Sequence, residues 1–185
     1  MVPHHFFGCM MKNIKEIAKG IRWFIMDVDG VLTDGGIIYD SNGNELKKFC
    51  VKDGMGITLL HNVGIKTAIL TSRRSPMVEK RAKELGIYEV IQGAKNKLQL
   101  YEKLKEKYSI VDDQILYIGD DFPDLPVLKR VGFPVCVKNS PEEIKNVCVY
   151  ITKKEGGDGA VREVSELLLK LQGKYEESIK KYTGD

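Results

Sequence analysis

Long apolar runs, blocks of one charge and closely spaced cysteines are all missing from this sequence. No run approaches the roughly 18 apolar residues that a membrane-spanning helix needs, and the N-terminus lacks the apolar core of a secretion signal. The net charge is only +3, with lysine and glutamate interspersed, so no basic block indicates a nucleic-acid partner. The four cysteines lie far apart without CxxC or Cys/His metal spacing, which favours reduced thiols. We therefore expect a cytoplasmic protein that binds neither a membrane nor nucleic acid.

The composition that remains is typical of one globular domain. The chain has 185 residues, of which 43% are hydrophobic and 30% charged, enough for a full core. We expect a single domain over residues 21–172, with a hairpin inserted at 35–51. An N-terminal extension with a short helix precedes it over 1–20, and a charged C-terminal tail follows over 173–185.

Strand-like and helix-like segments alternate along the chain. Core strands are predicted at residues 22–28, 66–70, 89–91, 114–118, 135–137 and 149–152. Helices are predicted at 55–62, 76–85, 96–107, 125–130, 141–146 and 160–171. This alternation predicts an α/β, Rossmann-like fold, with a mostly parallel sheet and helices on both faces. The hairpin, with strands at 35–39 and 45–51, interrupts the pattern after the first core strand and should project over the strand ends.

Two carboxylates follow the first core strand, in Asp27-Val-Asp29-Gly. Side chains two positions apart start on the same face of a strand. Two like charges held together cost free energy unless a cation, a proton or a ligand offsets them. The carboxyl end of a strand in an open α/β sheet is where ligands bind, so a binding role is favoured over a solvated acidic turn.

Further polar groups follow other strands on the same predicted edge of the sheet. The second strand ends at Thr71, with Ser72 and Arg73 beside it, and Lys97 begins a helix. A later strand ends at the acidic residues Asp120, Asp121 and Asp124. Each group alone is weak evidence, because a threonine after a strand is usually a cap and a lysine is usually solvated. Their convergence on one edge is the stronger signal.

Phosphoryl transfer through an aspartate needs this set of groups. One carboxylate attacks phosphorus, and a second protonates the leaving oxygen and then activates water. A hard divalent cation offsets charge, and a hydroxyl and a lysine hold the phosphoryl oxygens. The chain offers a candidate for every role, in the order Asp, Thr, Lys, Asp.

These residues resemble the motifs of the haloacid dehalogenase-like phosphatases. The family's DxDGx(T/V) motif matches Asp27-Val-Asp29-Gly-Val-Leu-Thr33, and its Thr/Ser, Lys and acidic motifs match Thr71, Lys97 and Gly119-Asp120-Asp121. The resemblance implies that Asp27 is the nucleophile and Asp29 the acid/base. It also implies Mg²⁺ held by Asp27, the Asp29 backbone carbonyl and Asp120. Asp121 and Asp124 would lie near the metal or serve as structural caps.

A narrower resemblance covers almost the whole chain. Segments such as Glu45-Leu-Lys-x-Phe49, GDDxxDLPV (119–127) and GGxGAVRE (156–163) are similar to the family of 3-deoxy-D-manno-octulosonate 8-phosphate (KDO 8-phosphate) phosphatases of lipopolysaccharide synthesis. The resemblance implies a capless enzyme acting on an anionic sugar phosphate. It also implies a homotetramer whose hairpins pack together, with each subunit capping its neighbour's site. The 156–163 segment is one that can close over an active site.

The same resemblance implies a set of substrate contacts. By match to the family, Arg73 and Arg81 are the leading contacts, and arginine is the favoured planar partner for a carboxylate. The remaining candidates, besides Asp29 and Lys97, are Cys50, Val51, Lys52, Asp53, Gly54 and Thr58, with Arg162 as a weaker one. Ser72, Cys50 and Lys52 replace the glycine, asparagine and arginine that are common in the family. These departures concern substrate contacts and leave the hydrolytic residues intact.

Three alternatives stay open on the sequence alone. A phosphorylatable receiver domain also uses aspartates, a threonine, a lysine and Mg²⁺, but in a different order. A non-catalytic oligomerisation module of the same fold would have no reason to keep all five motif residues. A nine-carbon 2-keto-3-deoxy sugar phosphate is a substrate that the sequence hardly distinguishes from KDO 8-phosphate.

Overall fold

The core strands of the protein run parallel to one another. The computed structural model describes residues 14–184. Its core strands are β1 (Trp23–Met26), β4 (Lys66–Leu70), β5 (Glu89–Ile91), β6 (Ile115–Gly119), β7 (Phe133–Cys136) and β8 (Tyr150–Ile151). They form one six-stranded sheet in the order β5-β4-β1-β6-β7-β8, and every pairing is parallel. The predicted α/β fold is confirmed.

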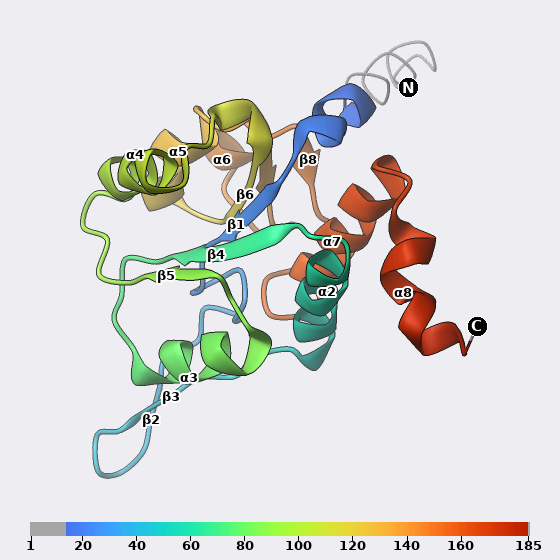
Figure 1. Cartoon of the computed structure of the whole chain (residues 1–185). Coiled ribbons are helices and arrows are strands. Elements are labelled where there is room, and N and C mark those ends of the chain that lie inside the picture. The colour runs from blue at the N-terminus through green and yellow to red at the C-terminus, as the bar shows by residue number, and fades with distance from the viewer. Residues whose placement is uncertain (1–13, 185) are drawn as a thin grey trace, which may run out of the picture.

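Helices cover both faces of this sheet (Figure 1). One face carries α4 (Lys97–Tyr108), α5 (Leu125–Leu128) and α6 (Glu142–Lys145). The other carries α2 (Val51–Asn62), α3 (Pro76–Leu85), α7 (Ala160–Leu171) and α8 (Tyr175–Thr183). Two short 3₁₀ helices are η1 (Asp112–Gln114) and η2 (Phe122–Asp124). Among residues 14–184, no helix is both long and apolar enough to cross a membrane.

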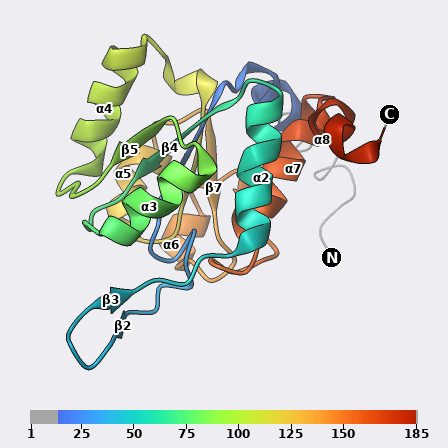
Figure 2. The same cartoon turned by 60° about the horizontal axis from the view of Figure 1, so that its bottom comes forward.

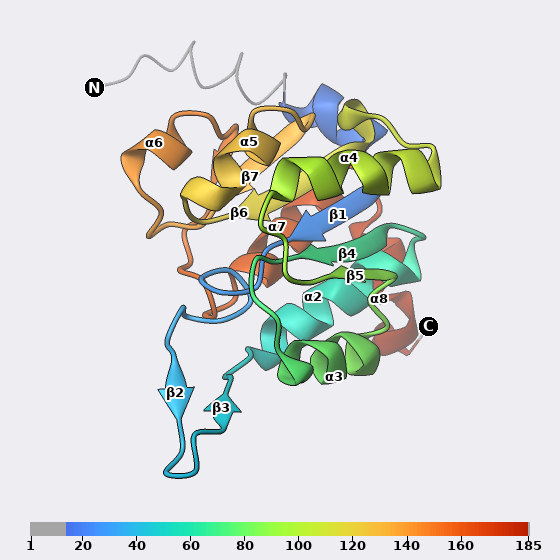
Figure 3. The same ribbon diagram turned by 90° about the vertical axis from the view of Figure 1, so that its left-hand side faces the viewer.

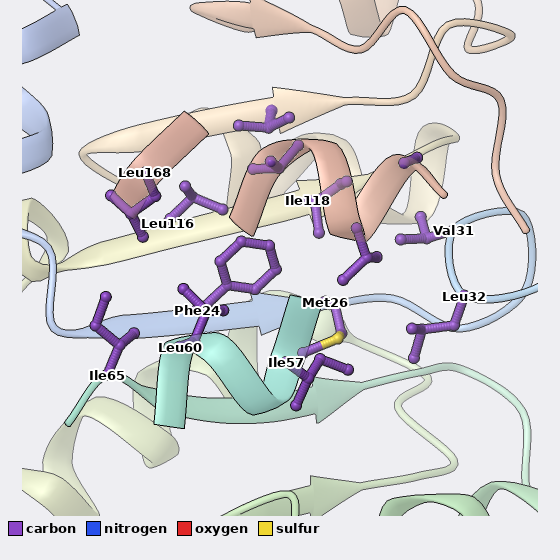
Figure 4. Packing of buried hydrophobic residues seen from close by; sticks show 14 of the residues in the cluster. Phe24, Met26, Val31, Leu32, Ile57, Leu60, Ile65, Leu116, Ile118 and Leu168 are labelled. Carbon is purple, nitrogen blue, oxygen red and sulfur yellow. The ribbon is translucent and has the colours of Figure 1, made fainter. Parts of the chain in front are cut away.

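Alternation along the central strand divides its side chains between two cores. Phe24 and Met26 of β1 point toward α2 and α7, where Ile57 and Leu168 meet them (Figure 4). Their strand neighbours Trp23 and Ile25 belong to the opposite core, under α4 and α5. A strand that is buried on both faces consists of nearly continuous apolar residues, which is why β1 could be predicted clearly from the sequence.

Helix α2 begins earlier than the sequence predicts. It starts at Val51 rather than at residue 55, and the hairpin strands β2 (Ile38–Tyr39) and β3 (Glu45–Leu46) are correspondingly short. Glycine has a low helix propensity, so Gly54 and Gly56 made the first turn of α2 difficult to predict from the sequence. Gly56 is nevertheless required by packing, because a Cβ there would lie 2.8 Å from Cα of Arg162 on α7.

The C-terminal segment differs from the expected charged tail. Residues 175–183 form α8, and Tyr175 and Ile179 pack against the core of the α2 face. The Asn62 side chain donates a 2.7 Å hydrogen bond to the Ser178 carbonyl. At the other end, the expected short helix is present over residues 14–20, and the rest of the predicted extension lies outside the described residues.

The hairpin projects away from the body of the domain. Figures 2 and 3 show β2 and β3 extending past α3 into solvent, with their base beside the strand ends. Large apolar side chains on it are exposed, namely Ile37, Ile38, Tyr39 and Leu46.

Candidate active site

A cavity of about 170 Å³ opens at the carboxyl ends of β1, β4 and β6. Its lining residues come from four separate segments: Asp27, Asp29, Thr71, Ser72, Arg73, Lys97, Asp120, Asp121, Pro123 and Asp124. The structure thus brings together the polar groups that the sequence places on one edge of the sheet.

Asp27 continues the line of β1 into the cavity. Its backbone N–H donates to the Ile118 carbonyl at 3.1 Å, which fixes it against β6. Burial, with the Asp124 carboxylate second, raises the pKa of Asp27 to about 6, although Lys97 acts in the opposite direction. The Lys97 ammonium lies 2.8 Å from Asp27 Oδ1 as an ion pair. A buried carboxylate beside one cation has the surroundings of a nucleophile.

Lys97 lies between two carboxylates. Its Nζ donates a 2.6 Å hydrogen bond to Asp124 Oδ1, whereas its contact with Asp27 lacks hydrogen-bond geometry. Burial alone would lower the pKa of Lys97, but the adjacent Asp27 and Asp124 carboxylates raise it above its ordinary value. The side chain is 3% exposed and therefore carries a fixed positive charge at the floor of the cavity.

Three carboxylates are close enough to share a cation. Oxygens of Asp27, Asp120 and Asp124 all lie within 4.8 Å of one another. Burial first, then the charges of Asp27 and Asp124, raises the pKa of Asp120 to about 8. Asp124 Oδ2 already accepts the backbone N–H groups of Asp120 and Asp121, at 3.0 and 3.4 Å. The groups with oxygen capacity left for a metal are therefore Asp27 and Asp120.

Two observations fit these carboxylates to a hard divalent cation. Asp27 Oδ1 is buried and has no hydrogen-bond partner among the described residues. Gly30, one residue after Asp29, lies so close to Asp120 that a Cβ there would be 2.1 Å from Asp120 Oδ2. Oxygen ligands gathered in this way are those that Mg²⁺ prefers.

Asp29 faces the hairpin. Its Oδ1 accepts a hydrogen bond from Lys47, and its Oδ2 lies 4.0 Å from Arg73 Nε. Arg73 in turn bonds Glu45 at 2.6 Å. The role of Lys47 was missed by the sequence reasoning, although the residue belongs to the matched Glu45-Leu-Lys segment. Lys47 lies two positions after Glu45 in the predicted strand 45–51, and this spacing is the signal that would have placed both side chains on one face.

Thr71 lies at the end of β4 on the opposite wall of the cavity. Its backbone N–H donates to the Ile91 carbonyl, and its own carbonyl accepts from Ala94, at 2.9 and 3.0 Å. These bonds fix a buried residue at the cavity wall. Ser72 beside it is exposed, and Asp121 accepts the Phe122 N–H at 2.8 Å as the N-cap of η2.

The remaining predicted substrate contacts do not line this cavity. They are grouped around the first turns of α2 and the neighbouring helices: Cys50, Val51, Lys52, Asp53, Gly54, Thr58, Arg81 and Arg162. Arg81 packs against Gly54, where a Cβ would lie 2.7 Å from its Nη2. Val51 and Lys52 are exposed, whereas Thr58 bonds the Gly54 carbonyl within α2.

Asp53 is buried and faces α7. Its Oδ1 accepts the Arg162 backbone N–H at 2.8 Å, so it binds the first turn of that helix. Burial raises the pKa of Asp53 to about 6. The structure thus gives Asp53 a capping contact that the sequence did not predict, and it gives the Arg162 guanidinium a 2.6 Å ion pair with Glu166.

The glycine-rich segment before α7 packs on the loop that follows Asp29. A Cβ on Gly156 would lie 1.7 Å from the Gly30 carbonyl oxygen, and the Gly157 N–H donates to the Val31 carbonyl at 2.9 Å. Only glycine permits such backbone contact. In this structure the segment packs against residues 30–34, the loop that follows Asp29.

A parallel α/β sheet with paired aspartates, a threonine, a lysine and a metal-compatible carboxylate at one edge defines an aspartate-dependent phosphoryl-transfer enzyme. Residues 83–164 match the family model described as haloacid dehalogenase-like hydrolase. The chain is 42% identical over 172 residues to the 3-deoxy-D-manno-octulosonate 8-phosphate phosphatase KdsC of Escherichia coli (strain B / BL21-DE3), covering 93% of this chain and 92% of that protein.

Solved structures agree with that match. The 3-deoxy-D-manno-octulosonate 8-phosphate phosphatase of Moraxella catarrhalis, in complex with magnesium, phosphate and KDO, is 48% identical, with a TM-score of 0.90 over 93% of this chain and 99% of that one. The cobalt-bound phosphatase of Haemophilus influenzae is 38% identical, with a TM-score of 0.82 over 86% and 93% of the two chains. The chain belongs to the family of 3-deoxy-D-manno-octulosonate 8-phosphate phosphatases, within the haloacid dehalogenase-like hydrolases.

Proposed function

We propose that the protein is a Mg²⁺-dependent phosphatase that hydrolyses KDO 8-phosphate to KDO and inorganic phosphate, in the cytoplasm, for lipopolysaccharide synthesis. The observation that carries this proposal is the convergence of Asp27, Asp29, Lys97 and Asp120 on one small cavity. The identity to KdsC over nearly the full length of both chains supports the same substrate. Free thiols at Cys50, Cys136 and Cys148 are consistent with a reducing compartment.

The chemistry follows from the positions of the two aspartates. An Asp27 oxygen attacks phosphorus, the bond to the sugar oxygen breaks, and Asp29 gives that oxygen its proton. Asp29 then takes a proton from the water that attacks the phosphoryl group on Asp27. Phosphate leaves and Asp27 returns as a carboxylate. Lys97 holds the phosphoryl oxygens from the cavity floor, and Thr71 is placed to donate a hydrogen bond from the wall.

Asp27 and Asp120, with the backbone carbonyl of Asp29, would hold the metal ion. When bound there, Mg²⁺ offsets the negative charge that Asp27 and the phosphate bring together. The raised pKa values of Asp27 and Asp120, about 6 and about 8, support a cation at this site, because burial and the neighbouring carboxylates disfavour the ionised form of both groups.

The cavity has room for only part of such a substrate. Its volume of about 170 Å³ is smaller than the roughly 300 Å³ of typical ligand pockets, so it suits the phosphoryl group and metal. The sugar acid would extend outward, past Arg73, toward the group around Cys50–Gly54, Thr58, Arg81 and Arg162. We assign the substrate carboxylate to Arg73 and Arg81 because guanidinium binds carboxylates in a bidentate manner.

The hairpin supports assembly into a homotetramer with shared sites. Ile37, Ile38, Tyr39 and Leu46 are between 47% and 62% exposed, on a hairpin whose strands are joined by two residue pairs. An apolar surface of this kind on a projecting element is typical of an interface. Packing of hairpins would bring a neighbouring subunit over the open side of the cavity and close the site.

A phosphate-release screen tests the substrate. Sugar phosphates of five to nine carbons, with and without a 2-keto acid group, are compared with Mg²⁺ and with a chelator. We expect the highest kcat/KM for KDO 8-phosphate and no turnover with the chelator. A preference for a nine-carbon 2-keto-3-deoxy sugar phosphate would reassign the substrate, and no hydrolysis of any phosphate would refute the enzyme assignment.

Sedimentation tests the assembly. The hairpin variant Ile38→Lys/Tyr39→Glu should be smaller than the wild-type protein and should lose affinity for the sugar phosphate. The matched control is Val111→Lys, which replaces an equally exposed apolar residue outside the hairpin. A fully active wild-type monomer would exclude the shared site.

A further inference from the structure

A buried tyrosine lies behind the lysine of the site. Tyr117 of β6 is fully buried, and its hydroxyl donates a hydrogen bond to Asp124 Oδ1. The same oxygen accepts the Lys97 ammonium at 2.6 Å. Tyr117 does not line the cavity and so cannot touch a substrate held there.

Strand alternation places the hydroxyl there. Tyr117 and Ile115 of β6 face the core under α4, whereas Leu116 and Ile118 face α2 and α7. Lys97 is the first residue of α4, on the side that Tyr117 faces. Asp124 is the last residue of η2, in the segment that follows β6, and its carboxylate lies within reach of both donors.

The hydrogen bonds of Asp124 occupy both of its oxygens. Oδ2 accepts the N–H groups of Asp120 and Asp121, and Oδ1 accepts from Tyr117 and Lys97. A carboxylate bound in this way orients its neighbours more readily than it coordinates a cation. Lys97 is therefore held at a defined position, 2.8 Å from Asp27 Oδ1.

We propose that Tyr117 is a positioning residue for phosphoryl transfer, acting through Asp124 on Lys97; this rests on the proposed function. The Tyr117 hydroxyl supplies part of the hydrogen bonding that Asp124 Oδ1 requires. Lys97 is then shared with Asp27 and remains available to the phosphoryl oxygens. Without the hydroxyl, Asp124 draws the ammonium toward itself and away from Asp27, and the charge that develops on phosphate loses stabilisation.

The protein contains its own control for this change. Tyr101 of α4 is also fully buried and donates to Asp112 Oδ1, which accepts Lys105 Nζ at 2.7 Å. This tyrosine–aspartate–lysine group has the same chemistry, but none of its three residues lines the cavity. Tyr101→Phe therefore removes the same kind of hydrogen bond without reaching Lys97.

The test compares Tyr117→Phe with Tyr101→Phe, on KDO 8-phosphate and on p-nitrophenyl phosphate, below the unfolding temperature of both variants. We expect Tyr117→Phe to lower kcat about tenfold, equivalent to about 1.4 kcal/mol. KM and the Mg²⁺ concentration for half-maximal rate should stay within about twofold of wild type. Tyr101→Phe should lower thermal stability and leave kcat unchanged. The aryl phosphate keeps the comparison measurable if the sugar acid is not the substrate.

A crystal structure of Tyr117→Phe provides a readout that does not depend on turnover. We expect the Lys97–Asp27 separation to lengthen while the Lys97–Asp124 bond is kept. Equal kcat for the two phenylalanine variants, or an unmoved Lys97, would overturn the proposal. A tenfold or greater rise in the Mg²⁺ requirement at unchanged kcat would overturn it as well, because it would make the Tyr117–Asp124 pair part of the metal site.

Discussion

Lys47 of the hairpin forms an ion pair with Asp29, two residues after Asp27. The Lys47 side chain is only 2% exposed, although the tip of the hairpin extends into solvent. The projecting element is thus anchored on the residue assigned as the acid/base, and it fixes the orientation of that carboxylate.

Replacing Lys47 should therefore slow catalysis. We expect Lys47→Met to lower kcat by roughly ten- to a hundredfold, a part of what acid–base catalysis contributes. Lys48→Met is the matched control, because Lys48 is an exposed lysine of the same segment and forms its ion pair, of 2.9 Å, with Asp34. Steady-state kinetics give kcat for both variants, and circular dichroism checks that both are folded. Equal losses in both variants would show a general effect of hairpin charge.

Asp27→Asn should abolish turnover without unfolding the protein. The amide cannot attack phosphorus, so we expect phosphate release to fall by on the order of 10³ or more. The exposed neighbour Asp121→Asn should keep most of its activity, because asparagine also caps a helix. Full activity of Asp27→Asn would refute the nucleophile assignment.

Asp29→Asn, in contrast, should accumulate phosphorylated enzyme or be inactive, because it cannot activate water.

The metal-free protein should become less stable as pH rises toward 8. In the folded state the pKa values of Asp27, Asp53 and Asp120 are raised from 3.8 to about 6, about 6 and about 8. At these three carboxyl groups the folded state binds more protons than the unfolded chain between pH 4 and 8, so their contribution to the free energy of unfolding falls across that range.

Urea unfolding at several pH values, with chelator and with Mg²⁺, measures this dependence. We expect Mg²⁺ to flatten it, since the cation replaces the protons on Asp27 and Asp120. Asp120→Asn should flatten the metal-free curve at its upper end. Stability that rises with pH in the chelated wild-type protein would contradict the raised pKa values.

Gly157→Ala should reduce both stability and activity. Gly157 has a φ of +70°, and a Cβ there would lie 2.4 Å from the Asp34 backbone nitrogen. Gly64→Ala is the control for backbone strain, with a φ of +81° and no atom within 4 Å of an added Cβ. Both should cost about 1 kcal/mol for the left-handed conformation. Only Gly157→Ala should also displace the loop at residues 30–34 that follows Asp29, and so lower kcat.

The sequence predicted well that polar residues gather at the strand ends, because each of them follows a recognisable element. The bounds of β4, α3, β5 and α7 agree with the prediction to the residue, since Pro76 and Gly86 mark α3 and apolar runs mark the strands. Because β1, β4 and β6 are parallel neighbours, their carboxyl ends lie at one edge of the sheet, and this brings Asp27, Thr71 and Asp120 together. Residues whose role depends on tertiary contact were harder to identify.

Asp53, Lys47 and Tyr117 illustrate that limit. The capping contact of Asp53 requires α7, more than a hundred residues later in the chain. The pairing of Lys47 with Asp29 depends on how the hairpin folds back at its base. Alternation predicts which face of β6 Tyr117 occupies, but not that Asp124 would lie within reach of its hydroxyl. Helix α8 was not predicted because most of its residues are charged or polar, and only a few apolar side chains pack it against the core.

The strand order also has a consequence for the protein as it leaves the ribosome. β1, which leads to Asp27, lies between β4 and β6, and the backbone of Asp27 is fixed by Ile118. A nascent chain that has not yet exposed Ile118 contains Asp27 but lacks both the strand that fixes its backbone and Asp120. Because domains fold as units during synthesis, phosphatase activity begins only when most of the chain has been translated.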